Sequence, residues 1–156
     1  MAVSHLSTVT RATADVKRLR VLFDTNVLVS AVLRGGVPGR ILEAARDGGV
    51  TGVVSLHILG EFRDVLTRPR LGVDTTLADA LAEEAAGFCE VVAVEHAGES
   101  WSADPDDDPV VEAAILGRVD VVVTGDAHLL VLDVPGLRFI RPVDLAAQLG
   151  LTADAD

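Results

Sequence analysis

The sequence predicts an α/β fold in which helices cover both faces of a mostly parallel sheet. Short apolar runs, typical of buried strands, alternate along the chain with helical stretches and short loops. The length of 156 residues suits one domain that buries well over half of its unfolded surface. Hydrophobic residues make up 49% of the chain, which excludes an intrinsically disordered protein.

The expected strands are short apolar runs that stop at polar or turn residues. In chain order they are predicted at residues 21–23, 50–54, 91–94, 121–123 and, as an edge strand, 137–140. Ser55 follows the second run and is a residue type that commonly caps a helix N-terminus. Pro142 suits the first position of the last helix.

The expected helices fill the stretches between these strands. They are predicted at residues 25–33, 39–47, 55–68, from Asp74 or Thr75 to about Cys89, from Pro109 to 117, and 142–149. The Gly- and Pro-containing stretch 34–38 is expected to break the chain between the first two helices, and Pro69 to end the third. The apolar stripe of the helix at 77–88 suits packing on the core, and an interface in a homodimer is the alternative.

We expect an N-terminal extension at residues 1–20, one folded domain at 21–150 and a short tail at 151–156. The extension is basic but lacks the apolar centre of a secretory signal, and no apolar run is long enough to span a membrane. A frayed terminus is a better account of it than a basic arm that touches nucleic acid. Cys89 is the single cysteine and has no intramolecular partner, so a cytoplasmic protein is expected.

The net charge of −11 argues against a broad basic face that binds nucleic acid by neutralising phosphates alone. It does not exclude a nuclease. Metal sites made of oxygen ligands are themselves clusters of negative charge, and bound divalent ions reverse the local field where a phosphate must lie.

Two aspartates directly follow expected buried strands. Asp24 comes after 21–23, and Asp126 follows 121–123 after Thr124 and Gly125. The carboxyl ends of strands in open α/β sheets are where ligands gather, which favours a shared site. The alternative for each aspartate alone is a helix N-cap that bonds the first free amides.

A third carboxylate, Glu61, lies on the helix predicted at 55–68. At 100° per residue it falls about a quarter-turn from the centre of the apolar stripe, at the rim of the buried face, from which it can point toward a shared cleft. The alternative is a solvated glutamate paired with Arg63 or Arg68.

The run from Asp104 to Pro109 places four carboxylates in five positions just ahead of a helix. Pro109 suits the first helical position, which makes Asp108 the natural N-cap. Capping needs one aspartate, and crowded like charges cost stability unless cations offset them, so a metal explains the surplus better than local structure does. A solvated acidic loop is the alternative.

Four ordered pieces of the sequence together resemble the PIN domain family. They are Val21-Leu22-Phe23-Asp24-Thr25-Asn26-Val27-Leu28, the helix with Glu61-Phe62 and Val65-Leu66, the run Asp104-Pro105-Asp106-Asp107-Asp108, and Val123-Thr124-Gly125-Asp126 with Leu129-Leu130. The likeness is greatest to the branch of toxins of toxin–antitoxin systems related to VapC, and it extends over nearly the whole chain.

This resemblance implies a three-layer α/β/α fold and a metal-dependent ribonuclease that cleaves single-stranded RNA by metal-activated water, with Mg²⁺ or Mn²⁺ as cofactor. It implies an antitoxin protein as partner in a type II toxin–antitoxin pair, one that inserts a basic side chain near the carboxylates, and commonly a homodimer. By position, the residues implied as catalytic acids and metal ligands are Asp24, Glu61, Asp107 and Asp126. The pattern leaves Asp107 and Asp108 open to exchange, so Asp108 counts as a further metal ligand.

Three polar residues are implied as supporting members of this site. They are Asn26, Thr124 and Asp104. Many relatives carry another acid two positions beyond the one matched by Asp126, where this chain has His128. The number of metal ions, one or two, is therefore open.

Two functions from other classes compete with the ribonuclease. A metal-dependent phosphatase can use a strand-end aspartate such as Asp24 as nucleophile, but it needs a second aspartate where this chain has Asn26. The other alternative is a non-catalytic module in which the acids hold only a structural ion or a partner. A zinc centre, a serine nucleophile and a P-loop are not supported, because their ligand spacings and glycine motifs are missing.

Overall fold

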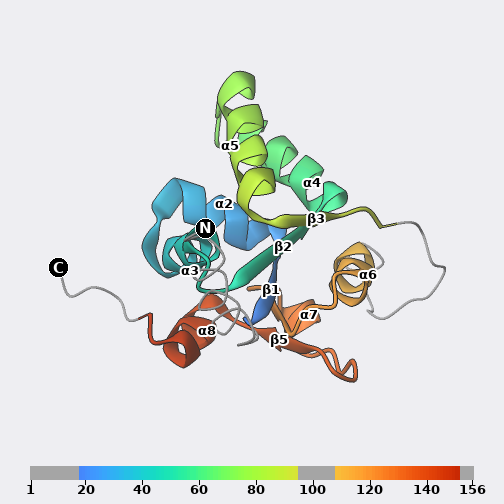
Figure 1. Ribbon diagram of the computed structural model, residues 1–156. Coiled ribbons are helices and arrows are strands. Elements are labelled where there is room, and N and C mark those ends of the chain that lie inside the picture. Colours follow the sequence, from blue (N-terminus) through green and yellow to red (C-terminus); the bar gives the residue numbers. More distant parts are fainter. Residues whose placement is uncertain (1–17, 95–107, 152–156) are drawn as a thin grey trace, which may run out of the picture.

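The computed structural model describes residues 18–94 and 108–151, which alternate between strands and helices as predicted (Figure 1). The strands in this part are β1 (Arg20–Phe23), β2 (Thr51–Ser55), β3 (Glu90–Val92), β4 (Val121–Val123) and β5 (Arg138–Ile140). The helices are α2 (Thr25–Arg34), α3 (Gly36–Asp47), α4 (Leu56–Thr67), α5 (Thr75–Phe88), α6 (Asp108–Leu116), α7 (Ala127–Leu130) and α8 (Pro142–Leu149). The predicted extension and tail lie almost entirely outside the described residues.

The described strands form one sheet in the order β3-β2-β1-β4-β5, and every neighbouring pair is parallel. The chain builds outward from β1 to β2 and β3, and then crosses to the other side of β1 for β4 and β5. The order therefore reverses between β1 and β4, and such a switch point is where open α/β sheets bind ligands beyond the carboxyl ends of their strands.

Helices cover both faces of this sheet. In Figure 1, α3 lies on one side of the strands and α6 on the other, while α4 and α5 pack side by side at the top of the view. The central strands are buried from both sides, as expected for a parallel sheet, and their fully buried residues include Val21, Leu22, Phe23, Val121, Val122 and Val123. The predicted three-layer α/β/α architecture is confirmed.

The predicted break at residues 34–38 is shorter than expected, because α3 begins at Gly36 and only Gly35 separates it from α2. Gly35 has a φ of 69°, a left-handed conformation that favours glycine. Pro38 lies within the first turn of α3, where its missing N–H has no partner inside the helix in any case. The proline therefore follows the start of the helix instead of preceding it.

Several other element boundaries differ from the expectation by one or two residues. The strand predicted at 91–94 is shorter and runs from Glu90 to Val92, and α6 begins at Asp108 instead of Pro109. Asp108 is therefore the first residue of α6 and not, as the sequence predicted, the N-cap residue before the helix.

Cys89 is buried between α5 and the sheet, as a small apolar residue would be. A Cβ atom added to Gly52 on β2 would lie 2.7 Å from the Cys89 sulfur, so the thiol fills the space that the glycine leaves. Burial raises the pKa of this thiol to about 12, which makes it inert as a nucleophile at neutral pH.

The apolar stripe of α5 is used mainly inside the fold. Ala78, Ala82 and Ala85 are buried, and α5 packs along α4, whereas Leu77 is exposed. Core packing therefore explains most of this stripe. None of the helices in the described ranges is both long and apolar enough to cross a membrane.

Candidate active site

Asp24 lies at the switch point, directly after β1, and both oxygens of its carboxylate are held. Its Oδ1 accepts a hydrogen bond from the Thr25 N–H at 2.8 Å, which caps the N-terminus of α2. Its Oδ2 accepts from the Thr124 hydroxyl at 2.7 Å. The residue is only 7% exposed. The N-cap role and a role in a site are therefore compatible, since each oxygen retains a further lone pair.

Asp126 is the third residue after β4, the strand that pairs with β1 through Phe23 and Val123. The two aspartates therefore follow neighbouring parallel strands at the same edge of the sheet. Thr124 links them, because its buried hydroxyl donates to Asp24 and accepts from the Asp126 N–H at 3.0 Å. The sequence predicted that Thr124 orients Asp126. In the structure the same hydroxyl also contacts Asp24.

The four-residue helix α7 is a feature that the sequence patterns did not predict. Asp126 caps it by accepting a hydrogen bond from the His128 N–H at 2.8 Å. A helix of four residues is too short to show apolar periodicity. Its one signal in the sequence was an aspartate, a residue type that commonly caps a helix N-terminus, directly before it.

Glu61 approaches the same site from α4. Ser55 begins this helix by accepting a hydrogen bond from the Ile58 N–H, as predicted, and α4 buries Ile58, Leu59, Phe62 and Leu66. The side chain of Glu61 remains 48% exposed, at the rim of the buried face. Its Oε1 accepts a hydrogen bond from the Thr25 hydroxyl at 2.8 Å.

The two arginines considered as alternative partners of Glu61 do not pair with it. Arg63 contacts Asp79 on α5 at 3.4 Å, and no ion pair joins Arg68 to a carboxylate within the described residues. Among the described basic groups, His57, one helical turn earlier, lies close to Glu61, with 3.7 Å between its Nε2 and Oε1.

The pKa of Asp24 is raised above the ordinary carboxyl value. Burial is the largest cause, and the negative charges of Asp126 and Glu61 add to it. The hydrogen bonds from Thr124 and from the Thr25 N–H oppose the shift only in part. No basic side chain of the described structure forms an ion pair with Asp24.

The raised pKa of Asp24 predicts a specific pH dependence of stability. Between the ordinary value of 3.8 and the higher folded-state value, the folded chain keeps a proton that the unfolded chain releases. The contribution of Asp24 to the free energy of unfolding therefore falls as pH rises through this interval. We expect urea unfolding in EDTA to show that, as pH rises through this interval, the free energy of unfolding of the unchanged protein falls relative to that of Asp24→Asn. A difference between the two proteins that is independent of pH would contradict the shift.

The remaining predicted residues are placed only in part. Asn26 lies in the first turn of α2 and is exposed. Asp108 begins α6, and Asp104 and Asp107 lie outside the described residues. The structure adds two residues that the patterns did not single out, Thr25 and His57. Two features of the sequence could have indicated them: Thr25 directly follows Asp24, and His57 lies four residues before Glu61, one helical turn away.

The sequence matches the PIN domain family over residues 20–128. The chain belongs to the PIN domain family. The matched segment includes every predicted site residue, from Asp24 through the acidic run to Asp126, and the resemblance stated for the sequence is confirmed.

The same fold occurs among solved structures. A chain in the crystal structure of VapBC2 from Rickettsia felis bound to a DNA fragment from their promoter matches with a TM-score of 0.58 and 14% sequence identity. The match covers 79% of this PIN domain and 98% of that chain. At this identity the likeness shows the fold alone. No curated protein matches the sequence.

The described carboxylates of this PIN domain are ligands of the type that a hard divalent cation binds. Asp24, Glu61 and Asp126 offer oxygen ligands of the kind that Mg²⁺ and Mn²⁺ prefer, and Asp24 is buried and forms no ion pair with a described basic side chain. Among the described residues, however, no three Asp, Glu, His or Cys side chains lie close enough together to hold an ion. The described residues alone therefore provide no complete ligand set, and the further acid that the sequence implies, Asp107, lies outside them.

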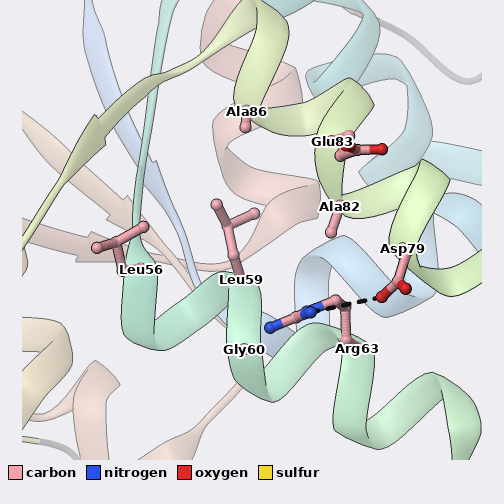
Figure 2. Close-up of a pocket in the computed structure, with 8 residues that line it drawn as sticks. All are labelled: Leu56, Leu59, Gly60, Arg63, Asp79, Ala82, Glu83 and Ala86. Carbon is pink, nitrogen blue, oxygen red and sulfur yellow. Dashed lines mark hydrogen bonds and ion pairs between the residues drawn. The ribbon is translucent and has the colours of Figure 1, made fainter.

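A groove of about 450 Å³ lies elsewhere on the PIN domain, between α4 and α5 (Figure 2). Leu56, Leu59 and Gly60 line one wall, and the ion pair between Arg63 and Asp79 spans it. None of the predicted site residues lines this groove. It is therefore a separate surface feature and not the acidic site.

Proposed function

We propose that this PIN domain is a cytoplasmic, metal-dependent endoribonuclease that cleaves single-stranded RNA and is the toxin of a type II toxin–antitoxin pair. The observation that carries the proposal is the environment of Asp24. A buried carboxylate with a raised pKa and two acidic neighbours is costly to the fold, and functional sites are where such arrangements concentrate. Membership in the PIN domain family agrees with a nuclease.

In this proposal Asp24, Glu61 and Asp126, together with Asp107 or Asp108, hold Mg²⁺ or Mn²⁺. When bound, the ion supplies positive charge for the phosphate and lowers the pKa of water toward neutrality. Thr124 keeps the Asp24 carboxylate oriented by donating to its Oδ2. Since the whole chain carries a net charge of −11, RNA must be attracted locally, at the point where these acids are neutralised.

An antitoxin partner is part of the same proposal. One solved structure of similar fold is a chain of VapBC2 bound to a DNA fragment from their promoter, and we therefore expect a partner protein for this chain. The negative field around Asp24, Glu61 and Asp126 suits a partner that places a basic side chain there. A homodimer also belongs to the proposal, and light scattering of the purified chain measures it.

The test is cleavage of a pool of single-stranded RNAs by the purified full chain, freed of any partner. We expect cutting with Mn²⁺ or Mg²⁺ and none with EDTA. A folded sample that cuts in no metal would contradict the nuclease and favour a non-catalytic binding module. Hydrolysis of a small phosphomonoester without RNA cleavage would instead support the metal-dependent phosphatase.

A further inference from the structure

Thr25 is a buried residue that contacts two of the predicted acids. It is the first residue of α2 and is 5% exposed. Its backbone N–H donates to Asp24 Oδ1 and its hydroxyl donates to Glu61 Oε1, both at 2.8 Å. One residue therefore connects a carboxylate at the end of β1 with a carboxylate on α4.

Glu61 has little else that fixes its orientation. Its side chain is half exposed, and glutamate has several rotatable bonds. The His57 Nε2 lies 3.7 Å from Oε1, which is too far for a hydrogen bond. Within the described structure, the Thr25 hydroxyl makes the hydrogen bond that holds this carboxylate.

The donor itself is well placed to fix an orientation. Thr25 is β-branched, so its side chain adopts few rotamers in a helix, and it is buried where α2 packs against α4. Its hydroxyl donates one proton, and that proton goes to Oε1 of Glu61. Oε2 accepts no hydrogen bond from a described residue and is left for another partner.

We infer that Thr25 is a positioning residue, which holds Glu61 so that its carboxylate and that of Asp24 face one divalent cation. The inference rests on the proposed metal-dependent function and adds a residue to it. A hydrogen bond to a metal-binding carboxylate orients the ligand before the ion arrives, and the loss of such partners typically weakens metal affinity about 10- to 100-fold.

The test measures Mn²⁺ binding to the full chain without RNA, by electron paramagnetic resonance of the unbound ion. Thr25→Val and Thr25→Ala remove the hydroxyl and keep the backbone N–H that contacts Asp24. We expect both to weaken Mn²⁺ binding about 10- to 100-fold. Thr25→Ser keeps the hydroxyl and is expected to retain most of the affinity.

Two controls separate positioning from a general effect on the fold. Thr67→Val removes another threonine hydroxyl, one that donates to the backbone oxygen of Arg63 on α4, and should leave Mn²⁺ binding unchanged. In a Glu61→Gln background, Thr25→Val should add no further loss, because the residue acts through Glu61. Circular dichroism verifies that each variant is folded, and Thr25→Ala serves if Thr25→Val does not fold.

The outcomes distinguish this inference from the function on which it rests. If the unchanged protein binds Mn²⁺ and the folded Thr25→Val and Thr25→Ala variants bind it equally well, the role of Thr25 is overturned and the metal site stands. Equal losses in the presence and absence of Glu61 would also overturn it. If the unchanged protein binds no Mn²⁺, the proposed function itself fails and the inference fails with it.

Discussion

Asp24→Asn is expected to lower metal-dependent RNA cleavage by at least about 100-fold, since a direct ligand should matter more than the partners that orient it. Asparagine has nearly the same size and can still accept the hydrogen bond from the Thr25 N–H. It removes the negative charge on which a cation depends. The measurement is the initial rate of cleavage of one RNA at saturating Mn²⁺, with the unchanged protein in parallel.

The stability of the same variant makes this result informative. Burial raises the pKa of Asp24, so the ionised carboxylate destabilises the metal-free fold. Its replacement by asparagine should therefore leave the free energy of unfolding at neutral pH equal or higher. Asp64→Asn is the matched control, since Asp64 is an exposed residue of α4 and its loss should leave cleavage unchanged. Cleavage by Asp24→Asn at the normal rate would remove Asp24 from the site.

Phe62→Ala is expected to destabilise the fold by about 3–5 kcal/mol. Phe62 is 1% exposed and is among the largest fully buried side chains, so its truncation removes apolar contacts and leaves a cavity. A domain of this size has a total stability of about 5–15 kcal/mol, so this loss is a large fraction. Urea unfolding followed by circular dichroism measures the change.

The neighbouring residue on the same helix provides the control for this loss. Arg63→Ala removes an exposed side chain whose ion pair with Asp79 joins α4 to α5 at the surface, and should cost no more than about 1 kcal/mol. Similar effects of the two substitutions would contradict the burial of Phe62. A large effect of Phe62→Ala alone would show that α4, and with it Glu61, is fixed through its apolar face.

Elements with strong local signals were predicted well. The runs that became β1 and β4 are apolar at nearly every position because both faces of a parallel strand are buried. Ser55 was predicted as a cap because a hydroxyl before an apolar periodic stretch satisfies a free amide. The start of α3 was misplaced because Pro38 is as compatible with the first turn of a helix as with a break before it.

The sequence alone determined the fold class, the family and the short set of acids that follow strands or rim a helix, because these depend on residue type and spacing within single segments. Only the tertiary structure decided that Thr25 and Thr124 connect those acids. Thr124 and Asp24 are 100 positions apart in the chain, and Thr25 and Glu61 are 36 apart. Local patterns carry no information about such hydrogen bonds, which form only when parallel pairing brings β4 beside β1 and packing brings α4 against α2.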